Sequence, residues 1–497
     1  MKSRSRTTVR SLSATLLLAV SLAVGETLDE REWLDVRSEN FRIHSVLGEK
    51  RTIELLRHLE IMHEALGHDV SVAVSAPATP TIILAVDNHD DYVDVGAPAF
   101  TSGYFYSDPR ENAILIEDTP DSSGVQIILH EYAHYLNRQA GRIRYPRWFE
   151  EGNAEYLSHS RLHNNAFEFA RPAVRHIATL GLSGWMPWST LLEVGDTSTL
   201  GLDEGALFYA QSWLLVHFLR SRPNADQTLP SDLARYSELA SQTASATEAF
   251  EKSFRVDISA LDEELLRYYL DRQFASRVLP VSSAFAGFAP RVDDMTQAEA
   301  RLALARMALR FDNMERAGSW FESVLPDAEL RAHAEAGLGR IAGHRGDLDT
   351  ANERFESAIF HMAWDFNIWM DYAQYWAQRV STSRNGDERD RYASGLIHAL
   401  ESALTIAEAT PELNYLMGFA YLAKGKDPLE AIAYLEAAAE SAPHDQASRL
   451  LLGNAYLYVG RPGEAIEVAE AVLRFEHEPG IVSNAAHELI KRANSER

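Results

Sequence analysis

The feature that most constrains this chain is a pair of histidines within one apolar helical segment. His130 and His134 flank Glu131 in a His-Glu-x-x-His pattern, and Glu131 is the only charged residue between positions 124 and 137. In an α-helix, residues four apart differ by about 40° around the axis and about 6 Å along it, so both imidazoles can converge on one ion. Glu131 would then lie beside the ion without binding it, where its carboxylate can accept a proton from water.

A catalytic zinc site of this kind needs a third protein ligand. The 497 residues include no cysteine, which excludes thiolate zinc sites, disulfides and a cysteine nucleophile. The ligand must therefore be a histidine or a carboxylate. A second helix is predicted to begin near Pro146, because proline is favoured in the first turn of a helix, and Glu150 and Glu151 follow within its first two turns.

The segment Trp148-Phe-Glu-Glu-Gly-Asn-Ala154 in this second helix resembles a known family pattern. It is similar to the Trp-x-x-Glu-Gly-x-Ala helix of gluzincin metallopeptidases, and residues 33–274 resemble their bacterial peptidase MA-like group. The resemblance implies an α+β zincin-like fold in which Glu151 is the third Zn²⁺ ligand, with 16 residues between it and His134. Glu150 remains the competing ligand, although its position about 100° around the helix favours solvent.

Glu155 lies one turn beyond Glu151 on the same helix face. Its carboxylate can accept a hydrogen bond from the spare ring nitrogen of His130, which would fix the tautomer of that ligand. The resemblance implies the same role, because gluzincins have an acidic residue at this place. A solvated surface glutamate is the alternative interpretation.

Tyr209 matches the tyrosine that supports the transition state in aminopeptidase-like gluzincins. The Lys-Gly that follows this tyrosine in the family is replaced here by Gln211-Ser212, so a packing role for Tyr209 stays open. His217 is an alternative donor for the oxyanion that develops in peptide hydrolysis. It lies on a leucine-rich helix face, where a core histidine is the other interpretation.

Short runs rich in β-branched and aromatic residues predict a small sheet before the histidine helix. The predicted strands are 40–45, 81–86, 102–106 and 113–116, and residues 51–66 have helical periodicity. The last two strands stand where an edge strand could pair with the backbone of an extended substrate. An internal position in the sheet is equally compatible with the sequence.

The C-terminal half is predicted to be an all-α solenoid of repeats. Gly418 and Tyr421 recur 35 residues later as Gly453 and Tyr456, which resembles the spacing of tetratricopeptide (TPR) repeats. In such repeats, small residues let paired helices approach and aromatic residues fill the gap. Weaker units cover 298–326, 330–360 and 365–406, and a capping helix is predicted at 481–492. A generic helical bundle is the alternative.

The N-terminus has the layout of a secretory signal peptide. Lys2, Arg4, Arg6 and Arg10 precede an apolar stretch at 12–24. This stretch is shorter than the roughly 20 residues of a membrane-spanning helix, so we expect cleavage before Glu26 and an extracytoplasmic (periplasmic or secreted) protein. An uncleaved anchor is the alternative; after cleavage no stable membrane insertion is expected.

The predicted organisation is a signal peptide (1–25), a gluzincin-like domain (26–275), a linker (276–292) and a TPR domain (293–497). Lys and Arg total 47 against 72 for Asp and Glu, and the net charge of −25 argues against nucleic acid as a partner. The sequence thus predicts an exported zinc peptidase that acts on peptides or proteins and docks a protein partner through its repeats. The alternative is a secreted TPR scaffold whose zinc domain is catalytically idle.

Overall fold

A computed structural model of the chain describes residues 26–496 with several internal gaps. The gaps are 68–80, 108–111, 120–122, 140–144, 164–165, 241–244, 282–284, 286, 426, 443–444 and 476–479. The predicted signal peptide, 1–25, lies outside the described residues. In the described part of the chain, no helix combines the length and the apolar character needed to cross a membrane.

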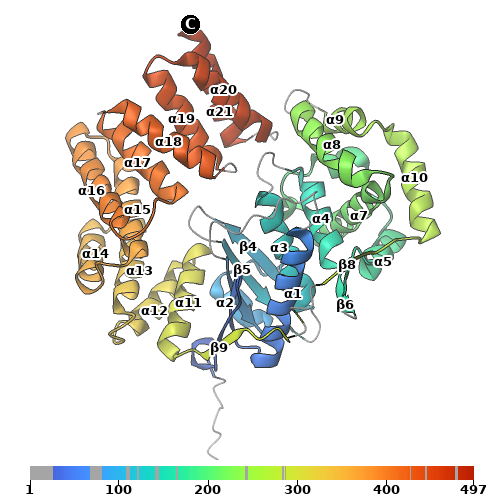
Figure 1. Cartoon of the computed structure of the whole chain (residues 1–497), viewed down its shortest axis with the longest axis horizontal. Helices are drawn as coiled ribbons and strands as arrows, with labels where there is room; N and C mark the ends of the chain where they lie inside the picture. Colours follow the sequence, from blue (N-terminus) through green and yellow to red (C-terminus); the bar gives the residue numbers. More distant parts are fainter. Residues whose placement is uncertain are drawn as a thin grey trace, which may run out of the picture.

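The N-terminal part is an α+β region built on a six-stranded sheet (Figure 1). Its strands are β1 (Leu34–Arg37), β2 (Phe41–Ser45), β3 (Thr81–Val86), β4 (Gly103–Ser107), β5 (Asn112–Glu117) and β9 (Arg291–Asp294). The order is β4-β5-β3-β2-β1-β9, with β2, β3 and β5 parallel and the other strands antiparallel to their neighbours. The four predicted strands are confirmed as β2 to β5. Of the last two, β4 is an edge strand and β5 is internal.

Alternation along the strands divides the buried side chains between the two faces of the sheet. Ile43, Ile83 and Ile114 join the core that contains α1 (Glu49–Gly67) and α3 (Gly124–Gln139). Neighbouring residues such as Leu84 and Leu115 point the other way, because successive side chains of a strand face opposite sides. That second face packs against α2 (His89–Val95) and α11 (Gln297–Arg310).

A helical region follows α3 and packs beside the sheet. Its helices are α4 (Arg147–Ser158), α5 (Val174–Ser183), α6 (Trp188–Glu193), α7 (Leu202–Ser221), α8 (Ala225–Ala240), α9 (Ala246–Phe254) and α10 (Ile258–Asp271). A three-stranded sheet of β6 (Arg161–His163), β7 (Ala166–Phe169) and β8 (Arg277–Pro280) lies next to them. Helices α1, α3 and α4 to α10 share one hydrophobic core, in which α4 contacts both α3 and α7.

The C-terminal half consists of antiparallel helix pairs, as the repeat spacing predicts. The pairs are α11 with α12 (Met314–Val324), α13 (Arg331–His344) with α14 (Leu348–His361), α15 (Phe366–Thr382) with α16 (Gly386–Leu404), α17 (Pro411–Lys424) with α18 (Pro428–Ser441), and α19 (Gln446–Tyr458) with α20 (Pro462–Phe475), followed by α21 (Ile481–Ser495). A Cβ atom on Gly418 would lie 2.5 Å from Leu435, and one on Gly453 would lie 2.5 Å from Leu489. These glycines therefore permit the close helix contacts that the repeat requires.

The segment predicted as a linker, 276–292, is not a simple connector. β8 extends the three-stranded sheet by pairing with β7, and β9 forms the far edge of the large sheet by pairing with β1. Proline is tolerated at strand ends and sheet edges, so Pro280 does not prevent this pairing. The predicted domains 26–275 and 293–497 also share a core, because α11 and α12 cover the second face of the sheet.

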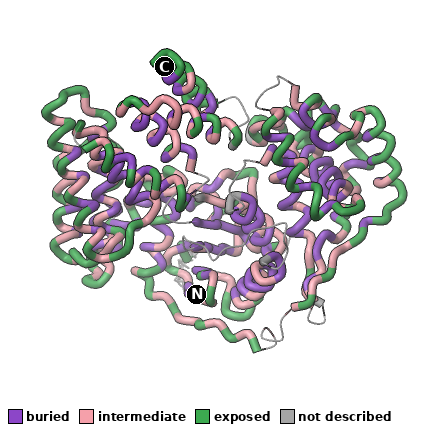
Figure 2. The backbone as a smooth tube through the Cα atoms, turned by 45° about the horizontal axis from the view of Figure 1, so that its top comes forward, coloured by how far each residue is buried: buried purple, intermediate pink, exposed green. Residues whose placement is uncertain are grey.

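The helix pairs curve around the α+β region and return toward it (Figure 1). The first pair lies on the sheet, whereas α20 near the C-terminus contacts α8 of the helical region. A cavity of about 1040 Å³ lies between α8 and helices α18 to α20. Buried residues run through the sheet and along the facing sides of the paired helices (Figure 2). The solenoid is thus attached to the N-terminal region at both of its ends.

His44 on β2 makes the stability of this sheet sensitive to acid. Burial, together with Arg42, lowers its pKa to about 4 against the opposing effect of Asp35, and neither of its ring nitrogens has a hydrogen-bond partner among the described residues. In an unfolded chain a histidine titrates near 6.5. Between about pH 6.5 and 4, the unfolded state therefore binds a proton at this histidine that the folded state does not bind. The free energy of unfolding falls as the pH drops through that window.

We expect this histidine alone to remove up to about 3 kcal/mol of stability by pH 4. The measurement is urea unfolding of the parent and of His44→Gln from pH 8 to pH 4. The glutamine cannot titrate, so the variant should lose less stability on acidification than the parent. Parallel curves for the two proteins would contradict the buried, neutral state of His44.

Candidate metal centre

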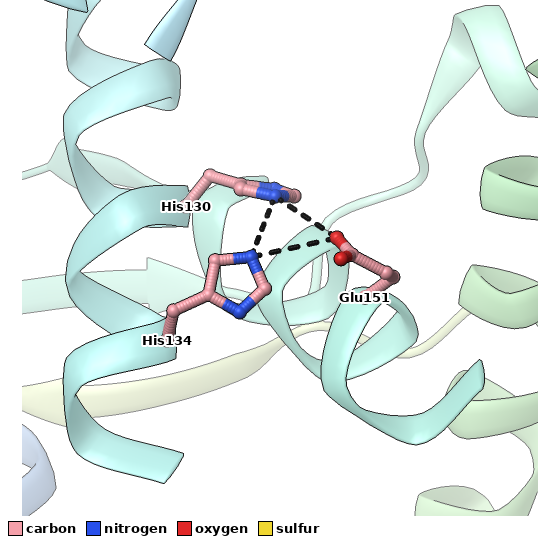
Figure 3. A group of neighbouring side chains, drawn as sticks. All are labelled: His130, His134 and Glu151. Carbon is pink, nitrogen blue, oxygen red and sulfur yellow. Dashed lines mark hydrogen bonds and ion pairs between the residues drawn. The ribbon is translucent and has the colours of Figure 1, made fainter. Parts of the chain in front are cut away.

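Three side chains from two helices converge on one point beside the sheet (Figure 3). His130 and His134 project from α3, and their Nε2 atoms lie 3.2 Å apart. Glu151 projects from α4, and its Oε2 lies 3.4 Å from each of these nitrogens. Ligands at zinc distances of 2.0–2.1 Å in a tetrahedron are separated by about 3.3–3.4 Å. The three atoms therefore already have the spacing of a tetrahedral zinc site with one position left open.

The environment of Glu151 also fits a cation. Its Oε2 is buried and has no hydrogen-bond partner among the described residues, although both imidazoles are close. Burial acts to raise the pKa of this carboxyl, but His134 and His130 hold that pKa well below its usual range. Burial likewise acts to lower the pKa of His130, but Glu151 and Glu155 raise it well above its usual value. The site attracts positive charge, which a divalent ion can supply in place of imidazole protons.

The structure separates Glu151 from its competitor Glu150. The Glu150 side chain is 17% exposed and lies 3.3 Å from Arg147, away from the histidines, whereas the Glu151 side chain is 5% exposed. Arg147 also lies 3.3 Å from Oε1 of Glu151 and so neutralises the oxygen that does not face His130 and His134. The ligand geometry thus selects Glu151.

Glu155 lies behind His130, as the sequence predicts. Its Oε1 is 3.4 Å from Nδ1 of His130, the ring nitrogen that faces away from the ion position. Burial acts to raise the pKa of Glu155, but His176 and His130 lower it well below its usual value, so the group is a carboxylate. A carboxylate at this place orients a ligating imidazole and strengthens it as a donor.

Glu131 is outside the ligand set and faces the edge strand β4. Its carboxylate accepts a hydrogen bond from the backbone N–H of Phe105, and a Cβ atom on Gly103 would lie 2.7 Å from its Oε1. Glycine at 103 therefore leaves room for the glutamate beneath the strand. Burial, reinforced by the charge of Glu151, raises the pKa of Glu131 against the effect of the histidines.

Tyr209 on α7 lies beside the centre, with its ring 6.4 Å from the ring of His130 between centroids. Burial and the charge of Glu151 raise its pKa, so its hydroxyl keeps its proton and can donate it in a hydrogen bond. A side-chain hydrogen bond joins Tyr209 to Thr197, which fixes the ring at the rim of the site.

His217 is a core histidine and not an alternative donor. It is buried, its Nδ1 lies 2.7 Å from the hydroxyl of Tyr268, and its Nε2 lies 3.1 Å from the carbonyl oxygen of Ala170. Both ring nitrogens are therefore occupied by partners outside the ligand set. The other hypothesis for this residue, a hydrogen-bonded core side chain, is confirmed.

The histidine helix is anchored at its N-terminus by Asp118. The carboxylate of Asp118 accepts a hydrogen bond from the backbone N–H of Gly124 at 2.9 Å, which satisfies one of the free donors at the start of α3. Arg51 of α1 holds the same carboxylate through two hydrogen bonds. This pair therefore sets where α3 begins, and sequence reasoning missed it because the partners are 67 positions apart.

The two residues that depart from the gluzincin pattern have structural roles. Gln211 is fully buried and exchanges two hydrogen bonds with the backbone of Met186, which ties α7 to the segment before α6. Ser212 brings its backbone against α4, where a Cβ atom on Gly152 would lie only 2.4 Å from the Ser212 carbonyl oxygen. Both residues thus serve the packing of α7 against the elements around it.

A polar chain links the helices that surround the centre. Asn153 on α4 donates to Asn137 on α3 at 3.0 Å, and Arg220 on α7 donates to Asn153 at 2.7 Å. These bonds fix the rotation of α4 relative to α3 and α7. The sequence carries no periodic signal for them, because each partner lies on a different helix.

Comparison with known proteins identifies a TPR repeat in the C-terminal half. The tetratricopeptide repeat family model matches residues 424–481, which span α18, α19 and α20. No curated protein matches the chain. Among solved structures, the chain is similar to a thermophilic TPR protein of Thermus thermophilus, with 19% identity over 40% of this chain and 98% of that chain and a TM-score of 0.32.

Two further solved structures are similar over more of the chain. Yeast Tom70 has 10% identity, covers 75% of this chain and 81% of its own, and has a TM-score of 0.30. The Cut9–Hcn1 hetero-tetramer of the APC/C has 13% identity, with coverage of 75% and 78% and a TM-score of 0.26.

Gly152→Ala tests the contact that positions Glu151. The added methyl group meets the backbone of α7, which cannot rotate away, so we expect a loss of about 1–3 kcal/mol in the free energy of unfolding. Gly205→Ala is the matched control, because Gly205 is also in a helix and a Cβ there meets nothing within 4 Å. The control should be neutral or gain up to about 1 kcal/mol from helix propensity. Equal effects of the two substitutions would refute the close contact.

Proposed function

We propose that the chain is an exported zinc peptidase of the gluzincin type, with a zincin-like N-terminal domain. The observation that carries the proposal is the tetrahedral spacing of His130, His134 and Glu151, with Glu131 placed next to them and outside the ligand set. A bound Zn²⁺ supplies the Lewis acidity that makes water a nucleophile near neutral pH.

The side chains around the ion position have complementary tasks in this proposal. Glu131 accepts a proton from the attacking water and later delivers it to the leaving amine. Tyr209 keeps its proton, so its hydroxyl can donate a hydrogen bond to the oxyanion of the substrate. Glu155 holds His130 in the orientation that its ligand role needs.

The free edge of β4 is the proposed binding place for the substrate backbone. Among the described strands, β4 pairs only with β5, and its backbone N–H at Phe105 already contacts Glu131. An extended peptide that adds to this edge gains main-chain hydrogen bonds and passes directly over the proton acceptor. Binding through main-chain groups suits a peptide or protein substrate.

The TPR repeat supports docking of a protein or peptide partner. The first helix pair of the solenoid reaches the proposed substrate strand, because Phe311 contacts Tyr104 of β4 with ring centroids 5.2 Å apart. A cavity of about 330 Å³ follows, lined mainly by the first helices of three successive pairs, α11, α13 and α15, with Arg340 and Asp371 among its residues. A polypeptide held there would lie close to the cleavage site. The export part of the proposal depends on residues 1–25.

Glu131→Gln separates catalysis from metal binding. The substitution keeps the size of the side chain but removes its capacity to accept a proton, so cleavage of a mixed peptide library by the zinc-loaded protein should fall by about 10²–10⁴-fold. Zinc content and thermal stability should stay unchanged. Glu150→Gln, on the same helix as Glu151 but outside the ligand set, is the control and should cleave like the parent.

A parent protein that contains zinc and cleaves none of the library, or a Glu131→Gln variant as active as the parent, would overturn the peptidase proposal. The first result would instead favour a secreted TPR scaffold with a catalytically idle zinc domain.

A further inference from the structure

A second group of metal-binding side chains lies on the far side of Glu155. Glu155 and His159 are one turn apart at the end of α4, and His176 reaches them from α5. The three residues offer donor atoms that all lie within 4.8 Å of one another. Oε1 of Glu155 lies toward His130 and Oε2 lies toward His176, so the same carboxylate contacts both the first centre and this group.

The two closest donor atoms of this group are near each other without making a hydrogen bond. Oε2 of Glu155 and Nε2 of His176 are 2.9 Å apart, yet both atoms are buried and neither makes a hydrogen bond of good geometry among the described residues. Oε2 of Glu151 in the first centre has the same combination of burial, nearby imidazoles and no hydrogen bond within the described part of the chain. Donors that converge on a shared point, rather than on each other, are what a metal site requires.

His159 completes the group. Its Nδ1 faces the other donors and lies 3.5 Å from Oε2 of Glu155. When no ion is bound, Nδ1 donates to the backbone carbonyl oxygen of Glu155 at 2.8 Å, because a carbonyl can only accept. Nε2 is left with a lone pair, to which the Gln126 amide can donate at 3.3 Å when no ion is bound. An ion that binds Nδ1 displaces the proton of that nitrogen.

We propose that Glu155, His159 and His176 form a second site for a divalent transition metal. Two imidazoles and a carboxylate suit Zn²⁺ or a similar ion such as Co²⁺ or Ni²⁺, and not Ca²⁺ or Mg²⁺, which prefer oxygen ligands. A divalent ion bound by one carboxylate and two neutral histidines forms a complex with a net charge of +1. The first centre has the same ligand types and would give the same net charge. The two sites are coupled, because an ion on Oε2 withdraws negative charge from the carboxylate that supports His130.

Zinc stoichiometry tests this proposal independently of the peptidase proposal. The metal-free full chain is dialysed against Zn²⁺, and bound zinc is then counted by elemental analysis. We expect two equivalents in the parent, one in His176→Ala and one in His134→Ala. His176→Gln keeps a hydrogen-bonding side chain beside Glu155 and should also lose one equivalent. His487→Ala removes an exposed histidine on α21 and should keep both.

The outcomes separate the two proposals. One equivalent in the parent that is lost in His134→Ala and kept in His176→Ala would overturn the second site and reduce the group to a hydrogen-bond network. Two equivalents retained in both His176 variants, with folding confirmed by circular dichroism, would also overturn it. One equivalent that is lost only in the His176 variants would support the second site and contradict the first centre.

Discussion

The close approach of α4 to α7 is the contact on which the candidate centre depends. The histidines are fixed by their spacing on α3, but Glu151 reaches them only if α4 lies at one depth and one rotation. The depth is set at Gly152, where no side chain separates α4 from the Ser212 backbone. The rotation is set by the hydrogen bonds of Asn153. A helix backbone contact of this kind leaves little freedom, so the carboxylate is held at ligand distance before an ion arrives.

Much of the centre follows from the sequence because its signals are local. The i and i+4 positions of the histidines need only a helix, and the resemblance to gluzincins placed Glu151 and Glu155 in the same register that the structure has. The His159 and His176 group could not be anticipated in this way. His176 lies on a separate helix, and only the folded chain brings it to Glu155.

The fold was less predictable where pairing depends on the rest of the chain. β1 alternates apolar and charged residues, but over only four positions, and three of the four residues of β9 are charged, so neither gives a clear strand signal. Both segments are strands because of their pairing: β1 pairs with β2, and β9 pairs with β1 at the edge of the sheet. Composition alone therefore made β9 resemble the end of a linker.

The shared core joins the two halves of the proposed function. Leu84 and Leu115 on the sheet are covered by α11 and α12, so the solenoid is part of the structure that supports β4 and α3. Its far end contacts α8 beside α7. In the proposed function, a helical array joined to the N-terminal region in this way would hold a bound polypeptide at a fixed distance from the candidate centre, which a flexible tether would not do.

The most direct test of the account is anomalous diffraction at the zinc edge from crystals of the zinc-loaded chain. The account predicts a peak between α3 and α4 at about 2.0–2.2 Å from Nε2 of His130, Nε2 of His134 and Oε2 of Glu151. Zinc bound elsewhere, with these three side chains turned apart and no peak between them, would contradict it.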